Sequence, residues 1–216
     1  MKLPTSGRRE AQATLLAALL IFCAGLSACK TKPTGARERV PTPSPAATAV
    51  PLSNGFDYPF GNNPKTTKPE AGWYDAQKFG ENTHLGEDWN RVTGGDSDCG
   101  LPVYAASKGV IVFAGDAGAG WGKVLIVRHK LSDARLVETL YGHLQSFGKT
   151  SGEVERRERI GSIGDGGGKY PCHLHFEVRL ANCPAWGQPG PGYSADRHGW
   201  ADPSEFIGAN RSLKAE

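Results

Sequence analysis

Three short segments of the chain hold residues that could bind a metal ion and move protons. The first runs from His84 to Asp88 and reads His-Leu-Gly-Glu-Asp. An imidazole nitrogen and a carboxylate oxygen are both good ligands for Zn²⁺. In a straight strand the two end residues would stand about 13 Å apart, too far to share one ion. The chain must therefore bend between them, and Gly86 permits a bend.

The second segment runs from His173 to Val178 and reads His-Leu-His-Phe-Glu-Val. Polar and apolar residues alternate, which is typical of a strand with one face in the core. The alternation places His173, His175 and Glu177 on one face, with about 6.6 Å between neighbours. One histidine could then bind a metal ion while the other assists beside it. Taken alone, the segment also fits the exposed polar face of an amphipathic strand.

The third segment is Tyr141-Gly142-His143-Leu144, which closes a strand-like run. A single histidine in such a place is more often structural than functional. His129 and His198 lie in no comparable pattern, and we interpret both as structural or surface residues.

Short strands and many turns must position these three segments. The chain has 216 residues, of which 29 are Gly, 15 are Pro and 38% are hydrophobic. This composition favours strands over long helices. The charged stretch 153–160 fits either a short helical turn or short strands. Strand-like runs bounded by Gly or Pro recur at Pro102 to Ala105, Gly109 to Ala114, Val124 to His129, Leu136 to Tyr141 and His173 to Leu180. Their spacing predicts an antiparallel all-β domain.

The three segments, taken in order, closely resemble the lysostaphin/LytM-type family of cell-wall zinc metallopeptidases. The resemblance covers about residues 55–208. It implies a small, hairpin-rich antiparallel β-domain, a sandwich or half-barrel, with long loops around a groove. Further matching segments are Pro102 to Ala106, Gly109 to Gly115, Gly120 to His129, Ile160 to Gly164 and Ala201 to Ile207.

The resemblance also implies a role for each residue of the three segments. His84, Asp88 and His175 would hold one zinc ion, which leaves a fourth position for water. Zinc lowers the pKa of such a water toward about 7. His143 and His173 match the two histidines that do not bind the metal; they would assist proton transfer and steady the tetrahedral intermediate.

The function implied is an endopeptidase that acts on peptidoglycan stem peptides or cross-bridges. Stretches 62–82, 91–100 and 184–193 differ from the usual family pattern, and we expect them to rim the groove. The alternative is a non-catalytic regulator that binds and activates other cell-wall hydrolases, but the complete ligand set favours the enzyme. A purely structural lipoprotein is a third interpretation. The net charge of +3 without a concentrated basic stripe disfavours nucleic-acid binding.

The first residues have the pattern of a bacterial lipoprotein leader. Lys2, Arg8 and Arg9 precede an apolar stretch from Leu15 to Leu26. As a helix this stretch would span about 18 Å, short of the roughly 30 Å hydrocarbon core, which favours a signal peptide over a membrane span. Leu26-Ser27-Ala28-Cys29 resembles a lipobox. We therefore predict a signal peptide at 1–28 and a lipid on Cys29.

The residues after the lipobox separate the lipid from the domain. Residues 29–53 are rich in Pro, Thr and Ala, so they cannot bury enough surface to offset their ordering entropy. We predict a flexible tether over 29–53 and a peptidase domain over 54–210. The lipid would anchor the protein in the cell envelope. Because Lys30 rather than Asp follows the lipobox, the outer membrane is favoured if the cell has one.

Three cysteines remain in the domain, and strand geometry limits how they can pair. Cys172 and Cys183 flank the strand-like run from His173 to Leu180. Seven steps of strand cover about 23 Å, and three further residues return only about 10 Å. A disulfide needs Cα atoms roughly 4.4–6.8 Å apart, so these two should not pair. Either Cys99 is joined to one of them, or all three are unpaired.

Overall fold

The computed structural model describes residues 49–62 and 69–212. The expected signal peptide at 1–28, Cys29 and residues 30–48 of the expected tether lie outside the described residues. One compact unit spans Pro45–Glu216. Its described part holds no helix that is long and apolar enough to cross a membrane.

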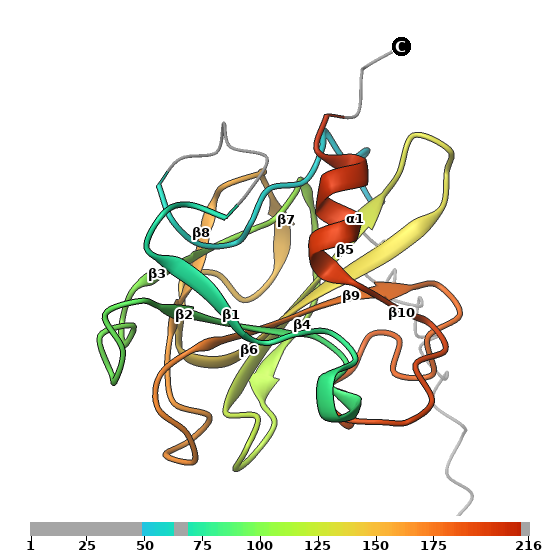
Figure 1. Cartoon of the computed structure of the whole chain (residues 1–216). Coiled ribbons are helices and arrows are strands. Elements are labelled where there is room, and N and C mark those ends of the chain that lie inside the picture. The colour runs from blue at the N-terminus through green and yellow to red at the C-terminus, as the bar shows by residue number, and fades with distance from the viewer. Residues whose placement is uncertain (1–48, 63–68, 213–216) are drawn as a thin grey trace, which may run out of the picture. The chain divides into compact units, whose positions relative to one another are not determined.

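The described residues of the unit form antiparallel strands, one short 3-10 helix and one α-helix (Figure 1). The strand order is β1-β2-β9-β6-β5-β4-β7, with β10 beside β9 and with β8 between β3 and β6. The prediction of an antiparallel all-β domain is therefore confirmed. The elements are β1 (Trp73–Gln77), η1 (Glu81–Thr83), β2 (Glu87–Arg91), β3 (Pro102–Tyr104), β4 (Gly109–Asp116), β5 (Lys123–Lys130), β6 (Leu136–Phe147), β7 (Gly152–Val154), β8 (Arg159–Ile163), β9 (Leu174–Leu180), β10 (Trp200–Ala201) and α1 (Pro203–Asn210).

The long strand β6 organises the sheet because it changes partners along its length. Its first part pairs with β9 as far as Gly142, opposite His175. From Leu144 onward it pairs with β8. His143 lies at the switch and has φ 58, a left-handed conformation that non-glycine residues rarely adopt. At this change of partner the side chain of His143 therefore departs from the regular up-and-down alternation of side chains along β6.

The apolar face of β9 forms the centre of the core. Leu174, Phe176 and Val178 are fully buried, as the alternating pattern predicts. Burying a side chain of this size stabilises the fold by about 1.5–3 kcal/mol. With one face of β9 fixed in the core, His175 and Glu177 must emerge on the other. The register of the polar face is therefore set by the packing of the apolar one.

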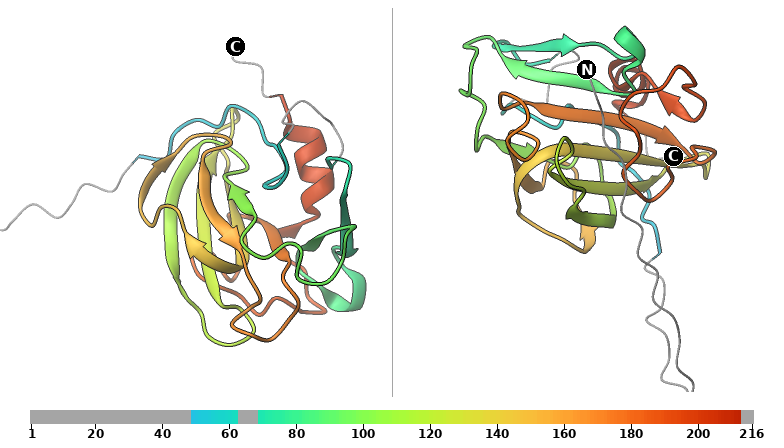
Figure 2. Two further views of the ribbon diagram at one scale, coloured as in Figure 1. Left: turned by 90° about the vertical axis from the view of Figure 1, so that its left-hand side faces the viewer. Right: turned by 90° about the horizontal axis from the view of Figure 1, so that it is seen from below.

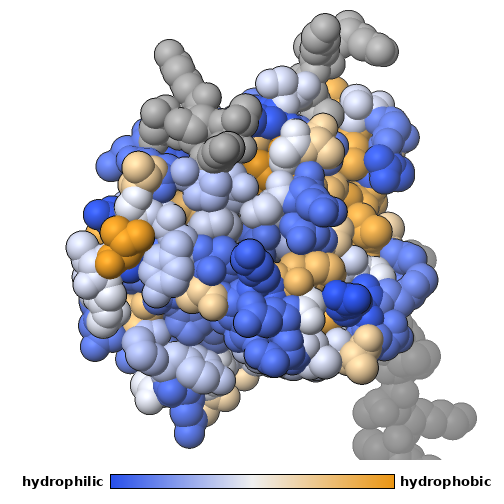
Figure 3. All heavy atoms as spheres, in the orientation of Figure 1, coloured by the Kyte–Doolittle hydropathy of each residue, from blue (hydrophilic) through white to orange (hydrophobic). Residues whose placement is uncertain are grey.

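A helix and an aromatic cluster close the core on one side. Asp202 caps α1 by accepting a hydrogen bond from the Glu205 N–H at 2.9 Å, and Pro203 occupies the first turn. Phe206 packs edge-on against Phe56, with ring centroids 5.0 Å apart. Figure 2 shows the strands side by side in a curved layer with α1 outside it. On the face drawn in Figure 3, hydrophilic residues predominate.

One disulfide joins Cys99 to Cys172, across 73 residues of sequence and with a Cα–Cα distance of 5.2 Å. The prediction that Cys172 does not pair with Cys183 is confirmed, and Cys183 is a buried thiol. The disulfide fixes the loop after β2 to the start of β9. Of the two alternatives for residues 153–160, the structure has strands β7 and β8 joined by a turn.

Candidate metal centre

Neighbouring strands bring Asp88 and His175 face to face. Asp88 lies on β2 and His175 on β9, and the two are direct partners in the antiparallel ladder. His84 precedes β2, directly after η1. The bend expected between His84 and Asp88 is present at Leu85 and Gly86. Gly86 also allows a close approach to β9, since a Cβ there would lie 2.5 Å from the carbonyl oxygen of Phe176.

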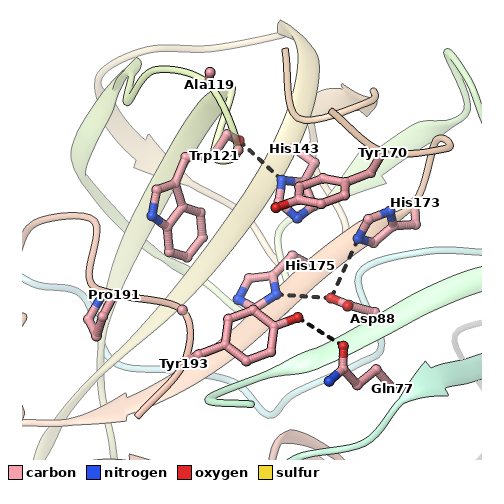
Figure 4. A pocket seen from close by; sticks show the side chains of 12 residues that line it. Gln77, Asp88, Ala119, Trp121, His143, Tyr170, His173, His175, Pro191 and Tyr193 are labelled. Atoms are coloured by element: carbon pink, nitrogen blue, oxygen red, sulfur yellow. Dashed lines mark hydrogen bonds and ion pairs between the residues drawn. The ribbon is translucent and has the colours of Figure 1, made fainter. Parts of the chain in front are cut away.

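The three predicted ligands converge on one point (Figure 4 labels two of them). The His175 Nδ1 atom lies 2.9 Å from Asp88 Oδ1 and 3.0 Å from His84 Nε2. The remaining side of the triangle, from His84 Nε2 to Asp88 Oδ1, is 3.4 Å. Two ligand atoms at about 2.1 Å from a tetrahedral ion stand about 3.4 Å apart. One side of the triangle, at 3.4 Å, has this length and the other two, at 2.9 and 3.0 Å, are shorter, so the three atoms lie close to the spacing of ligands around one zinc ion.

Hydrogen bonds on the far side of each ring fix which nitrogen faces the centre. The His84 Nδ1 atom lies 3.2 Å from the carbonyl oxygen of Gln77, to which it donates. The His175 Nε2 atom lies 3.0 Å from Glu177 Oε1, to which it donates. Each ring then directs the lone pair of its other nitrogen to the same point. At 3.0 Å the two facing nitrogens share a proton or bind the same metal ion, so the residues present fit a zinc ion.

The charges of the cluster also favour a cation. Burial disfavours the charged form of Asp88, yet hydrogen bonds with His175 and His84 hold its pKa well below the usual range. Burial likewise disfavours the charged form of His175, but Asp88 and Glu177 outweigh it and raise the pKa of His175 to about 9. The centre therefore attracts positive charge, whether a proton or a metal ion.

His143 and His173 stand beside the triangle on the same cavity. Their rings are 4.6 Å apart, and His173 Nε2 lies 3.7 Å from Asp88 Oδ1. The Nδ1 atom of His143 donates to the Trp121 carbonyl oxygen at 3.2 Å, and that of His173 donates to the Pro171 carbonyl oxygen at 2.9 Å. Burial, followed by the neighbouring His175 and His173, lowers the pKa of His143 to about 3. The His143 ring is therefore neutral near pH 7.

The cavity over these residues has a volume of about 390 Å³. Figure 4 shows the aromatic side chains of Trp121, Tyr170 and Tyr193 among those that line it. Tyr170 and Tyr193 are each nearly half exposed. The lining residues are Gln77, Asp88, Ala119, Gly120, Trp121, His143, Tyr170, His173, His175, Pro191, Gly192 and Tyr193.

Two of the three stretches expected to rim a groove contribute to this cavity. Gln77 comes from 62–82, and Pro191 to Tyr193 come from 184–193. The expectation is wrong for 91–100, because no residue of this loop is among the described residues that line the cavity. The loop is instead tied to the start of β9 through Cys99.

Trp121 and Tyr170 are pocket residues that the sequence did not point to, and Tyr193 lies in a stretch that the sequence placed at the rim without singling it out. Tyr193 is held over His84 by backbone hydrogen bonds, from Leu85 N–H to the Gly192 carbonyl and from Ser194 N–H to the Thr83 carbonyl. Its ring centroid lies 4.9 Å from that of His84. Its hydroxyl donates to Gln77 Oε1 at 2.8 Å. A Pro- and Gly-rich loop gives no periodic signal from which this placement could be read.

The other two histidines are placed as the sequence predicts. His129 is fully buried and bonds the Lys108 carbonyl oxygen at 2.9 Å and the Thr139 hydroxyl at 2.8 Å. His198 is exposed and contacts Asn182. Neither histidine lines the cavity.

Residues 83–185, which include all five candidate residues, match the sequence profile of Peptidase family M23. The chain is 39% identical over 112 residues to the DD-carboxypeptidase/endopeptidase Mpg of Neisseria meningitidis, which is 50% of this chain and 25% of that protein. It is 32% identical over 80 residues to the lipoprotein NlpD of Yersinia enterocolitica, which is 37% of this chain and 78% of that protein. The chain thus spans about a quarter of the length of Mpg.

Among solved structures, the chain resembles the antimicrobial peptidase lysostaphin from Staphylococcus simulans. The TM-score is 0.45 at 25% identity, over 63% of this chain and 48% of lysostaphin. A putative peptidase M23 from Pseudomonas aeruginosa gives a TM-score of 0.47 at 24% identity, over 71% of this chain and 55% of that one.

Proposed function

The chain belongs to peptidase family M23, and from that premise we propose that it is a zinc-dependent endopeptidase that hydrolyses peptide bonds in peptidoglycan. The observation that carries the proposal is the triangle of lone pairs from His84, Asp88 and His175 beside two further histidines on one cavity. A structural role would not need a buried cluster of this kind at the floor of an accessible pocket.

His84, Asp88 and His175 are the proposed zinc ligands. A zinc ion held there supplies Lewis acidity, which makes water a stronger acid and polarises a carbonyl group. The set comprises two imidazoles and one carboxylate, and with three protein ligands a zinc ion would have a fourth position left for water. This is the donor set of a catalytic site rather than a closed structural one.

His143 and His173 are the proposed catalytic residues. Because each donates its Nδ1–H to a backbone carbonyl, Nε2 is the atom that can accept or return a proton. The Nε2 atom of His143 carries the free lone pair of the ring and is the proposed acceptor of a proton when water attacks. His173, nearer to the opening, is suited to steady the tetrahedral intermediate through its Nε2–H when it is protonated.

The proposed substrates are peptides of peptidoglycan, in stem peptides or cross-bridges. The names of two relatives support this class, because one is a DD-carboxypeptidase/endopeptidase and the other is the antimicrobial peptidase lysostaphin. The half-exposed aromatic rings at the cavity opening suit a peptide chain, on which they can pack against backbone and side chains.

A place in the cell envelope is proposed from the leader and from relatives named as lipoproteins. These include lipoprotein NlpD and outer membrane antigenic lipoprotein B. A lipid on Cys29 and a tether over 29–53 would let the peptidase domain over 54–210 reach peptidoglycan from a membrane. Leu52, near the end of the proposed tether, forms a bridge with Lys130 of β5.

Purified peptidoglycan provides the test. The zinc-loaded chain should release soluble fragments, a chelator should stop the release, and added zinc should restore it. The alternative regulator would bind zinc or partner hydrolases and release no fragments by itself. That outcome, with fully occupied zinc, would contradict the proposed enzyme.

A further inference from the structure

We propose that Glu177 is a positioning residue that locks His175 as a metal ligand through Nδ1. The inference rests on the proposed function, because it assigns a role toward the zinc ion. Glu177 lies outside the cavity lining and contacts the centre only through the far nitrogen of His175. It therefore acts through a ligand and not on substrate.

Both carboxylate oxygens of Glu177 accept hydrogen bonds in a fully buried position. Oε1 accepts from His175 Nε2 at 3.0 Å. Oε2 accepts from Arg179 Nε at 2.6 Å and from Trp200 Nε1 at 2.8 Å. Glu177 and Arg179 have no exposed surface, and His175 and Trp200 have little. The carboxylate can therefore neither rotate away nor exchange a partner for water.

The strand places the three charged or ionisable side chains in a row. His175, Glu177 and Arg179 are spaced by two residues along β9, so they share its polar face. Trp200 reaches the row because β10 pairs with β9, with Trp200 opposite Arg179. Regular pairing thus delivers every partner of Glu177 without a special loop conformation.

This arrangement decides which nitrogen of His175 can bind a metal ion. An imidazole can ligate through either nitrogen, and the choice follows the hydrogen bond of the other. Since Glu177 can only accept, it holds a proton on Nε2, and Nδ1, which faces His84 and Asp88, is the nitrogen left for a metal ion. Arg179 pairs with the other oxygen of Glu177 at 2.6 Å and keeps the carboxylate charged in the buried layer.

Glutamine cannot take over this role despite its equal size. With its oxygen toward His175, its NH₂ group would face the donors of Arg179 and Trp200. With the amide reversed, the NH₂ group would face the Nε2–H of His175 and would favour a proton on Nδ1, where the metal ion must bind. In either orientation the NH₂ group faces another hydrogen-bond donor in a buried position without water, which is energetically costly.

Glu138 offers a matched control. It is as deeply buried as Glu177 and lies on β6, opposite Arg179 in the ladder. Its oxygens accept from Arg128 at 2.9 and 2.6 Å and from the Gly187 N–H at 2.8 Å, not from a proposed ligand. Replacing it by glutamine perturbs the same buried layer without touching His175.

The experiment measures zinc dissociation constants of the full chain by chelator competition at fixed pH, for wild type, Glu177→Gln and Glu138→Gln. We expect Glu177→Gln to bind zinc about 10- to 100-fold more weakly, as removal of a partner of a ligand commonly does. Glu138→Gln should stay within about twofold of wild type on the same reasoning. Equal affinity of Glu177→Gln and wild type, or equal weakening of both variants, would overturn the proposal.

A second measurement needs no substitution, in case Glu177→Gln does not fold. Nitrogen-15 NMR of the histidine rings in zinc-loaded wild type should show His175 protonated on Nε2; protonation on Nδ1 would overturn the proposal. A wild type that binds zinc in this way but cleaves no peptidoglycan would contradict the proposed enzyme and leave the role of Glu177 supported. A wild type that binds no zinc would overturn both.

Discussion

At the scale of residues, the four histidines around the centre share one property. Each has one ring nitrogen committed to a fixed acceptor, a backbone carbonyl for His84, His143 and His173 and a carboxylate for His175. The other nitrogen of each ring is then available to a metal ion or a proton. Tautomer control of this kind is what separates a functional histidine cluster from a collection of polar side chains.

Removing one proposed ligand should remove the metal. His84→Ala removes one of the three proposed zinc ligands. Loss of a residue that only hydrogen-bonds a ligand weakens metal binding by up to about 100-fold, so loss of a ligand itself should weaken it further. Metal analysis after dialysis checks this, with His198→Ala as the control on an exposed histidine. Full zinc occupancy in His84→Ala would contradict the ligand assignment.

The two proposed catalytic histidines should behave differently from the ligands. His143→Ala and His173→Ala should keep zinc and lose roughly 10²- to 10⁴-fold in kcat, the usual contribution of general acid–base catalysis. Zinc content and peptide release are measured on the same samples. Loss of metal from either variant would instead support the other possible ligand group, Asp88, His143 and His173.

Buried His129 should make the fold sensitive to acid. Burial lowers its pKa from 6.5 to about 4, so the unfolded chain binds a proton more readily than the folded one between these pH values. Its contribution to stability is complete above pH 6.5 and is lost as the pH falls toward 4, by roughly 3 kcal/mol. Urea unfolding across this range should show a stability advantage of wild type over His129→Gln that shrinks on acidification. An advantage independent of pH would contradict the assignment.

At the scale of elements, the alternation of polar and apolar residues made β9 predictable, whereas other strands and loops of the site could not be predicted from sequence. The apolar set Leu174, Phe176 and Val178 determines which face carries the histidines, and the structure keeps that face. β2 reads Glu-Asp-Trp-Asn-Arg without alternation. Its place beside β9 comes from tertiary pairing, which no local pattern encodes.

The eight-residue helix α1 was also not predicted as a helix. It is too short to show a 3.6-residue period, although Asp202 and Pro203 together form a recognisable start signal. The placement of Tyr193 depends on backbone pairing between two loops, at His84 and Tyr193. Such contacts between distant irregular segments leave no trace in the spacing of residues.

The disulfide should stabilise the fold by holding the loop after β2 against the start of β9. Closing a loop with a sequence separation of 73 residues contributes about 4 kcal/mol in the chain-entropy model. Reductant should therefore lower the free energy of unfolding of wild type by up to this amount, measured in urea. In the double variant Cys99→Ala and Cys172→Ala, reductant should change nothing. Equal stability of wild type with and without reductant would contradict the contribution.

At the scale of the whole molecule, the fold gathers distant chain segments around one cavity. The two ends of the described domain are also in contact. Asp57, close after the proposed tether, forms salt bridges with Arg156 at 2.6 Å and with Arg211, directly after α1, at 3.2 Å. These salt bridges stabilise the first residues of the domain against local unfolding where the proposed tether joins it.

Attachment to a membrane should depend on Cys29 alone. Cys29→Ser removes the thiol that the lipid would modify, so the chain should move from the membrane fraction to the soluble fraction. The exposed His198→Ala variant, processed in the same way, should stay with the membranes. A Cys29→Ser chain that still sediments with membranes would point to an uncleaved membrane span.

The most direct test of the central claim is digestion of purified peptidoglycan in ¹⁸O-labelled water, followed by mass analysis of the released fragments. A zinc endopeptidase adds water across a peptide bond, so each cut should yield a new amino group and a new carboxyl group carrying one ¹⁸O atom. His84→Ala should release none of these fragments. Fragments cleaved in the glycan instead, or no fragments from the zinc-loaded wild type, would contradict the account.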